Sequence, residues 1–223
     1  MGQNFSVRFV VGILVLFASA VSRLSAAQTS ATGAMVNVLV MNYSVAPSEV
    51  LVKAQAEASR IFARSGIELA WTYCPPRRSV VSNPTCDSEA AGEIRMRVLG
   101  HQLNNVFQDS IFGFAIAPTF ATVYYDSAHL LVETASDSES YLPVVLGGLM
   151  AHEIGHLLLG ENQHTVSGIM QARWDILQIQ QLMKGALQFT PQQSLRMRNN
   201  IQVRAGPPSI TRLDSIEIHR ALN

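Results

Sequence analysis

The segment "GGLMAHEIGHLLLG", residues 147–160, places three ionisable side chains inside an otherwise apolar run. Apolar residues recur at helical spacing from about Tyr141 to Leu159, so this part of the chain predicts a helix with a large buried face. Burying His152, Glu153 and His156 in such a helix would cost free energy unless a metal ion satisfied them. The chain is therefore expected to fold around a helix that is both part of the core and rich in metal-binding groups.

The spacing of these three residues suits zinc chemistry. On a helix, His152 and His156 stand one turn apart on the same face, where two imidazoles can bind one zinc ion at about 2.0–2.1 Å. Glu153 can face a metal-bound water, take its proton and pass it to a leaving nitrogen. The alternative is that both histidines are ordinary core residues, and their spacing around a glutamate in so apolar a helix argues against it.

A catalytic zinc site normally has three protein ligands and one open position for water. Gly160 allows the chain to turn sharply after the helix, and His164, four residues later, can return to the same metal. We therefore predict His164 as the third ligand, with His101, His129 and Asp175 as the alternatives.

The sequence "HEIGHLLLGENQH", followed by "SGIM", resembles the metzincin clan of zinc metallopeptidases. That clan pairs H-E-x-x-H-x-x-G-x-x-H with a downstream methionine turn. In this chain each of the last two steps is one residue longer, which gives the variant HExxHxxxGxxxH and adds up to about 3.3–3.6 Å of reach per residue. The resemblance implies Zn²⁺ as the cofactor and assigns these roles: zinc ligation by His152, His156 and His164, general base catalysis by Glu153, a bend at Gly160, and a methionine beneath the zinc at Met170.

The N-terminal half alternates between strand and helix patterns. Met35–Tyr43 is rich in Val and predicts a strand, a helix is expected from Pro47 to Gly66, and Ile67–Tyr73 predicts a second strand. Such a strand-helix-strand unit is expected to have a right-handed crossover. Glu93–Leu99 alternates apolar and charged residues, as a strand with one solvated face does.

Strand and helix patterns continue along the chain. Strands are expected around Ala121–Tyr125 and near His129–Val132, whereas the section from Gly113 to Pro118 is expected to be a loop. Helices are expected at Trp174–Leu187 and from the cap Thr190 to the stop Gly206. These elements predict a single α/β (α+β) domain with a mixed twisted sheet, a backing helix, an active-site helix and C-terminal helices, as the resemblance to a zincin domain also implies.

Charge and composition set few limits on function. Sixteen basic residues balance sixteen acidic ones in the 223-residue chain, without a long run of either sign. This balance gives no indication of a nucleic-acid partner or of an anionic membrane surface. With 48% hydrophobic and 14% charged residues, the chain is long enough for one substantial core.

The N-terminus has the pattern of a secretory signal peptide. Arg8 precedes an apolar run, and small residues favour cleavage after Ala27, with Ala20 as the alternative site. An uncleaved anchor helix is a further alternative, although the run falls short of the roughly 20 apolar residues that a span needs. The expected organisation is a signal peptide at 1–27, a metalloprotease-like catalytic domain at 28–206 and a C-terminal tail at 207–223.

Export to the periplasm or the extracellular space changes how Cys74 and Cys86 are interpreted, because an oxidising compartment favours a disulfide between them. Two free thiols, or two metal ligands, are the alternatives. The bond would close a loop with little apolar content to hold it.

These inferences predict an exported zinc metalloendopeptidase that hydrolyses peptide bonds by a metal-activated water, with Glu153 as general base. Its partner would be a peptide or protein substrate. Nucleic acid and stable membrane insertion after signal cleavage are not expected, and the oligomeric state is left open. The alternatives are a zinc-stabilised, non-catalytic secreted binding domain and a zinc amidase acting on a non-protein amide. Tyr124 and Tyr125 either line the substrate cleft or are ordinary strand aromatics.

Overall fold

The computed structural model of this protein describes residues 33–75, 84–87, 92–101, 112–136, 138–160 and 164–204. Within these ranges, five strands form one sheet in the order β2-β1-β3-β5-β4. Their bounds are Ala34–Asn42 for β1, Ile67–Tyr73 for β2, Ile94–Leu99 for β3, Gly113–Ile116 for β4 and Phe120–Tyr124 for β5. β1 pairs in parallel with β2 and β3, β3 pairs in parallel with β5, and β4 runs antiparallel to β5. The mixed sheet of an α/β domain, expected from the sequence, is confirmed.

One face of this sheet belongs to the core. Val36, Val38 and Val40 of β1 are buried, whereas Met35 and Asn37 are exposed. Because successive side chains of a strand point to opposite faces, this alternation turns the valines toward the helices. β3 repeats the pattern with the buried residues Ile94, Met96 and Val98.

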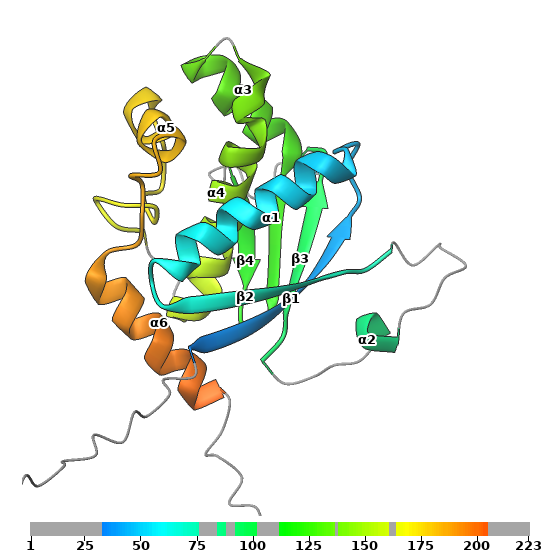
Figure 1. Ribbon diagram of the computed structural model, residues 1–223, viewed down its shortest axis with the longest axis vertical. Helices are drawn as coiled ribbons and strands as arrows, with labels where there is room; N and C mark the ends of the chain where they lie inside the picture. The colour runs from blue at the N-terminus through cyan, green and yellow to red at the C-terminus, as the bar shows by residue number, and fades with distance from the viewer. Residues whose placement is uncertain are drawn as a thin grey trace, which may run out of the picture. The chain divides into compact units, whose positions relative to one another are not determined.

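Two long helices, α1 (Ser48–Ala63) and α4 (Leu142–Leu159), pack against each other on the core face, and α1 crosses in front of the sheet in Figure 1. α1 connects β1 to β2, and the parallel pairing of those strands confirms the predicted strand-helix-strand unit. The buried residues of α1 recur at helical spacing and are Leu51, Ala54, Ala58, Ile61 and Phe62. The backing helix expected from the sequence is therefore α1.

α4 is the central helix of the core. Every residue from Leu142 to Leu159 is buried except Pro143 and Val144. The stretch Glu139–Leu159 is long and apolar enough to cross a membrane by length and composition, but 89% of its most apolar window is buried inside the protein. Strands and other helices cover these residues, so α4 has the environment of a core helix.

α3 (Tyr125–Ala135) differs from the sequence prediction, which places a strand near His129–Val132. Ala128, Leu131 and Val132 are its buried residues beyond the first turn, and their spacing is that of one helix face. A short apolar run does not by itself distinguish a strand from a helix, which is why this prediction was wrong.

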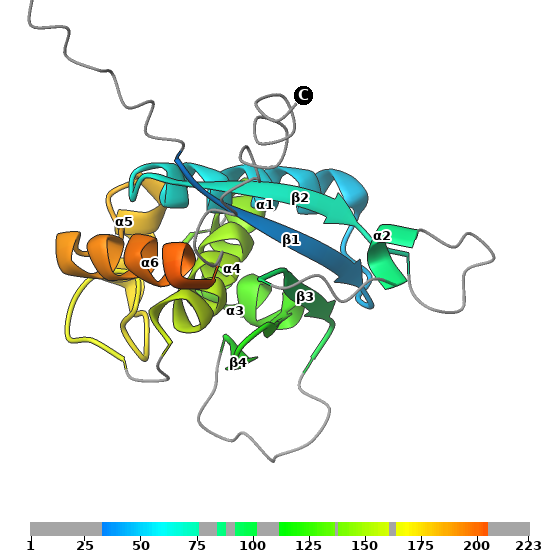
Figure 2. The ribbon, with the colours of Figure 1, turned by 90° about the horizontal axis from the view of Figure 1, so that it is seen from below.

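β4 (Gly113–Ile116) is a strand where the sequence predicts a loop. Its four residues pair with β5 from Gly113 opposite Val123 to Ile116 opposite Phe120. Pairing with a neighbour, rather than local propensity, stabilises so short a strand. β4 forms the edge of the sheet on the side away from β2 (Figure 2).

α5 (Ile176–Met183) confirms a helix within the predicted range Trp174–Leu187. It begins later than predicted because the carboxylate of Asp175 caps its first turn. That carboxylate accepts hydrogen bonds from the backbone N–H groups of Leu177 and Gln178.

α6 (Pro191–Arg204) confirms the second C-terminal helix and its predicted cap. The backbone N–H of Gln193 donates to Oγ1 of Thr190 at 3.2 Å, and the backbone N–H of Thr190 donates to Oε1 of Gln193 at 2.9 Å. This reciprocal pair is a capping box. The expected stop at Gly206 lies outside the described residues.

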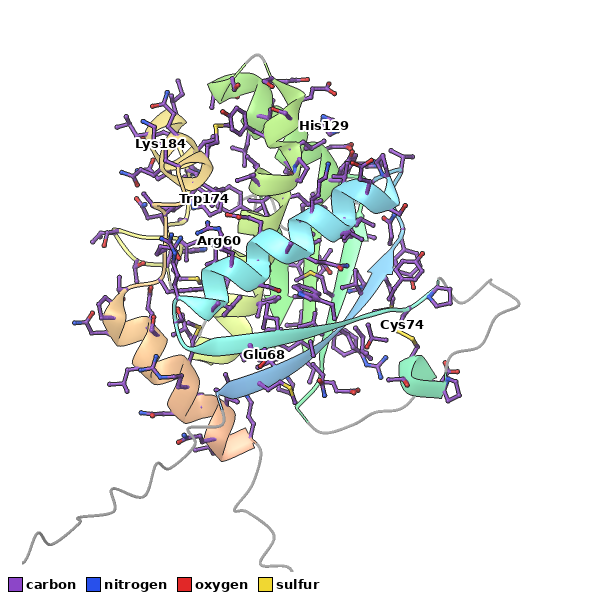
Figure 3. All side chains as sticks on the ribbon, viewed as in Figure 1. Arg60, Glu68, Cys74, His129, Trp174 and Lys184 are labelled. Carbon is purple, nitrogen blue, oxygen red and sulfur yellow. A yellow bond between two sulfur atoms is a disulfide. The ribbon has the colours of Figure 1, made fainter. Side chains whose placement is uncertain are left out.

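Cys74, just after β2, and Cys86, in α2 (Pro84–Asp87), form the predicted disulfide (Figure 3). Their Cα atoms are 5.6 Å apart, and 12 positions separate them along the chain. Both cysteines are therefore paired, which excludes the free-thiol and metal-ligand alternatives. The predicted signal peptide 1–27 and the tail 207–223 lie outside the described residues.

Candidate metal centre

The structure brings together the three histidines that the sequence proposes as zinc ligands. His152 and His156 lie on α4, and His164 lies beyond the bend at Gly160. Each offers one ring nitrogen, and these nitrogens all lie within 4.8 Å of one another. The ring centroid of His164 is 5.3 Å from that of His152 and 4.9 Å from that of His156. Among the described residues, no other group of three or more His, Cys, Asp or Glu side chains has a spacing that suits a metal ion.

Hydrogen bonding fixes the orientation of the His152 ring. Its Nδ1 lies 2.8 Å from the carbonyl oxygen of Ile169, which also accepts a hydrogen bond from Nε1 of Trp174 at 3.3 Å. A carbonyl oxygen only accepts, so Nδ1 carries the proton and the lone pair is on Nε2. That Nε2 is 3.1 Å from Nε2 of His156. His152 therefore presents the nitrogen that a metal ion needs, held by the kind of partner that orients metal ligands.

The distances within the cluster fit zinc. Two tetrahedral ligands, each about 2.0–2.1 Å from zinc, lie about 3.3–3.4 Å from one another. The 3.1 Å between the Nε2 atoms of His152 and His156 is close to that separation. His164 is exposed on the segment after the bend, and its ring nitrogen lies within 4.8 Å of those of the other two histidines. Three imidazoles are also a known ligand set of catalytic zinc sites.

Burial keeps two of the imidazoles in the form that binds metal. Burial, followed by the charge of His156, lowers the pKa of His152 to about 3, although the hydrogen bond to Ile169 acts in the opposite direction. Burial also lowers the pKa of His164. Both rings are therefore neutral at neutral pH, with a nitrogen lone pair free for coordination.

Glu153 adjoins the histidines and is 3% exposed. Its Oε2 is buried and has no hydrogen-bond partner among the described residues. Burial raises the pKa of Glu153 to about 8, and a nearby cation would favour the charged carboxylate instead. A buried carboxyl oxygen without a partner costs free energy. A buried carboxyl oxygen without a partner, on a residue that adjoins the histidine cluster, is therefore a second indication of a metal site.

The segment that carries His164 is held at both ends by α6. Gly160, with a φ of 71°, ends α4 in the left-handed conformation that favours glycine. Nδ2 of Asn200 donates to the last two carbonyls of α4 at 2.9 and 3.2 Å, and Arg204 donates to the carbonyl before them. On the far side of His164, Nε2 of Gln193 donates to Oγ1 of Thr165 at 3.3 Å. These side chains satisfy helix-end carbonyls that have no partner within the helix.

Met170 packs against α4 at Gly155. It is fully buried, and its Sδ lies 2.7 Å from the position that a Cβ would occupy at Gly155, the residue before His156. The ring of Phe189 lies 2.8 Å from the same position. Only glycine leaves room for these contacts, so Met170 and Phe189 approach α4 closely at Gly155, next in sequence to His156.

Phe112, immediately before β4, is a residue of the site that the sequence analysis missed. Its ring packs edge-on against His152 at a centroid distance of 5.2 Å, and it packs against Trp174 in a tilted arrangement at 4.8 Å. Trp174 also lies edge-on to His152 at 6.0 Å. The two aromatic rings form an apolar wall beside the metal centre. Phe112 is distant in sequence from the motif, and no local pattern marks it.

The alternative third ligands lie elsewhere and are not part of the cluster. His129 is on α3, where its ring packs edge-on against Tyr125 at 4.7 Å (Figure 3). Asp175 caps α5, and His101 follows β3. Tyr124 and Tyr125 are 3% and 6% exposed, so both are buried, and Tyr125 belongs to the hydrophobic core.

No protein-family model matches this chain, and no curated protein matches its sequence. Several solved structures are similar to it, and they include a zinc-dependent peptidase and an archaemetzincin. A zinc-dependent peptidase from Methanocorpusculum labreanum (strain Z) is 14% identical, with 72% of this chain and 99% of that chain covered and a TM-score of 0.48. Archaemetzincin from Methanopyrus kandleri is 14% identical, with 76% of this chain and 97% of that chain covered and a TM-score of 0.48.

Proposed function

We propose that this chain is a metzincin-like, zinc-dependent metallopeptidase. One observation carries the proposal: the ring nitrogens of His152, His156 and His164 converge within 4.8 Å, and Glu153, next in sequence to His152, has a buried Oε2 without a hydrogen-bond partner among the described residues. The histidines hold Zn²⁺, and Glu153 is left free of coordination to act on protons.

Glu153 performs the acid-base work. When bound, zinc in such a site acts as a Lewis acid on a carbonyl group and lowers the pKa of a water molecule to about 7. Glu153 takes a proton from the water molecule that attacks the peptide carbonyl, and it passes this proton to the leaving nitrogen. Because Glu153 is 3% exposed, bulk solvent does not compete for that proton. The apolar wall of Phe112 and Trp174 keeps the ring of His152 in place during the reaction.

We further propose that the enzyme is an endopeptidase that binds an extended substrate along β4. β4 is the edge of the sheet, so the outer side of its backbone is available for strand addition. Phe112, which packs against His152, comes immediately before this strand, so the edge leads to the metal centre. A peptide paired with β4 extends past the centre in both directions, which suits cleavage of an internal bond.

We also propose export to the periplasm or the extracellular space, with 1–27 removed and 28–206 as the catalytic domain. The Cys74–Cys86 disulfide supports an oxidising compartment. N-terminal sequencing of the exported protein tests the proposal. A chain that begins at Gln28 agrees with it, whereas a chain that keeps residues 1–27 in the membrane fraction identifies an uncleaved anchor.

The central experiment compares the parent with Glu153→Gln. Zinc content is measured first, and both proteins then digest a broad peptide library with and without a chelator. We expect near-stoichiometric zinc in both proteins, chelator-sensitive cleavage by the parent, and a loss of about 10²-fold to 10⁴-fold in kcat/KM for Glu153→Gln. Glu68→Gln, at an exposed position of β2, is the matched control and keeps parental activity.

Each other outcome has a defined meaning. A zinc-loaded parent that cuts no peptide is the non-catalytic binding domain, or a zinc amidase if it cleaves a non-protein amide. Peptide cleavage by Glu153→Gln at the parental rate would contradict the mechanism. A folded parent that takes up no zinc would remove the basis of the proposal.

A further inference from the structure

A cavity of about 670 Å³ lies at the carboxyl ends of β1 and β3. Its lining comes from the turn after β1, residues 43–45, from β3 and the residues that follow it, including Arg97 and His101, and from Asp126 in the first turn of α3. The volume is typical of a small-molecule site. The three histidines of the metal centre do not line it, so the cavity is separate from the proposed zinc site.

The order of the strands explains why a cavity opens at this place. The chain places β2 on one side of β1 and then places β3 on the other side. The order in which strands are added to the sheet therefore reverses between β1 and β3. In open α/β sheets, the connections from two such strands diverge, and ligands bind in the crevice outside their carboxyl ends. Here the turn at 43–45 leads away to α1, which leaves space beside the end of β3.

Arg97 brings to this cavity a positive charge that has no ion-pair partner among the described residues. It lies between Met96 and Val98 of β3, which are both fully buried in the core, so its side chain is on the opposite face of the sheet. Its Nε is buried and has no hydrogen-bond partner among the described residues, and its guanidinium group makes no ion pair there. A buried N–H group without a partner costs free energy, and a bound anion would remove that cost.

The other lining residues limit the charge and the shape of the anion that can bind. Asp126 also lines the cavity without pairing to Arg97, so a ligand with two negative charges, such as phosphate, meets more repulsion than a carboxylate does. A carboxylate also matches the two-pronged geometry of a guanidinium group. Tyr43, Val45 and Leu99 add apolar surface. We propose that this cavity binds a small organic monocarboxylate, with its carboxylate on Arg97 and its apolar tail against Val45 and Leu99.

Hexanoate, its neutral analogue hexanamide and inorganic phosphate test the proposal. Each is titrated into the zinc-loaded protein while the backbone amide signals of Ser44 and Gly100 are followed by NMR. We expect saturable shifts with hexanoate at millimolar concentrations, and binding weaker by about tenfold or more for hexanamide and for phosphate. The titration is repeated after zinc has been removed with a chelator. A carboxylate that binds in this cavity keeps its affinity, whereas a carboxylate that binds to zinc loses it.

Variants locate the binding charge. Arg97→Met should lose hexanoate binding by about tenfold or more, and Arg97→Lys should keep part of it. Arg64→Met, which removes an exposed arginine just beyond the C-terminus of α1, is the matched control and should bind as the parent does. If Arg97→Met does not fold, the comparison of hexanoate with hexanamide on the parent decides the question.

Three results would overturn the proposal: no shift with hexanoate, equal affinity for hexanoate and hexanamide, or parental binding by a folded Arg97→Met. Shifts that centre on His152 and disappear on chelation would place the carboxylate on zinc and also refute it. None of these readouts requires peptide hydrolysis, so the cavity and the proposed peptidase activity can fail independently.

Discussion

Ile169 links the metal centre to the backbone behind it. Its carbonyl oxygen accepts hydrogen bonds from Nδ1 of His152 and Nε1 of Trp174, and its N–H donates to the carbonyl of Gln188 at 3.0 Å. The orientation of the His152 ring therefore depends on a main-chain group that is itself held in place. A metal ligand that is oriented before the metal arrives loses less conformational entropy on binding.

Replacing His164 tests the third ligand. His164→Ala removes one of the three imidazoles, and we expect zinc affinity to fall by more than the roughly 10- to 100-fold that loss of an outer hydrogen-bond partner costs. Zinc content after dialysis and competition with a chromogenic chelator measure the change. His129→Ala, on α3, is the control and should retain zinc. Parental zinc affinity in His164→Ala would show that His164 is not a zinc ligand.

Gly155→Ala tests the contact of Met170 and Phe189 with α4. The added Cβ would lie 2.7 Å from Sδ of Met170 and 2.8 Å from the ring of Phe189, inside a packed core. Overpacking of this kind costs about 1–3 kcal/mol, and each kcal/mol lowers the Tm of a domain of this size by about 2–4 °C. Thermal unfolding measures the loss. Gly33→Ala adds a Cβ that meets nothing within 4 Å, so it should leave the Tm unchanged.

At the scale of elements, α6 holds both ends of the segment that carries His164, the proposed third zinc ligand. Asn200→Asp keeps the shape of the side chain but removes the N–H donors to the last carbonyls of α4, and it places a negative charge at the negative end of that helix. We expect zinc affinity to fall by about 10- to 100-fold while the protein stays folded. Asn199→Asp changes the exposed neighbour in the same way and should bind zinc as the parent does. Equal zinc affinities in the two variants would refute this role of α6.

The disulfide connects β2 to α2, and its contribution is to stability. In the chain-entropy model, a bond that closes a loop of about this length contributes roughly 3 kcal/mol. We expect the double variant Cys74→Ser, Cys86→Ser to lose about that much free energy of unfolding in a denaturant titration. Its zinc content should be unchanged, because neither cysteine belongs to the metal cluster. A loss of zinc from the folded double variant would contradict this separation.

The sequence predicts the elements whose signals are local. α4 has a long apolar helical pattern that ends at a glycine, and α6 has a capping box at Thr190 and Gln193, so both helices are recognised correctly. β4 and α3 are not recognised. β4 is stabilised by its pairing with β5, and the short apolar run of α3 fits either kind of element.

The same distinction applies to the site. His152, Glu153 and His156 lie within one helical turn, where spacing alone indicates a shared face. The other parts of the site, Phe112, Ile169 and Asn200, come from distant segments that only the tertiary structure brings together. Spacing therefore predicts the ligands of the metal centre but not the residues that orient them.

For the molecule as a whole, zinc and folding are expected to be coupled. A ligand that binds only the folded state stabilises it by about 2.7 kcal/mol when present at 100 times its Kd. For a domain of this size that corresponds to about 5–11 °C in Tm. We expect a chelator to lower the Tm by an amount in this range and added zinc to restore it. A Tm that stays constant while zinc is removed would exclude this coupling.

Because α4 supplies both the middle of the hydrophobic interior and two of the metal-binding side chains, random mutagenesis of that helix would mostly yield chains that fail to fold, whatever their catalytic potential. Laboratory evolution toward new cleavage preferences would gain more from libraries confined to residues 114–116 of β4 and to the exposed residues 165–167, 172 and 173, which do not fill the interior of the protein.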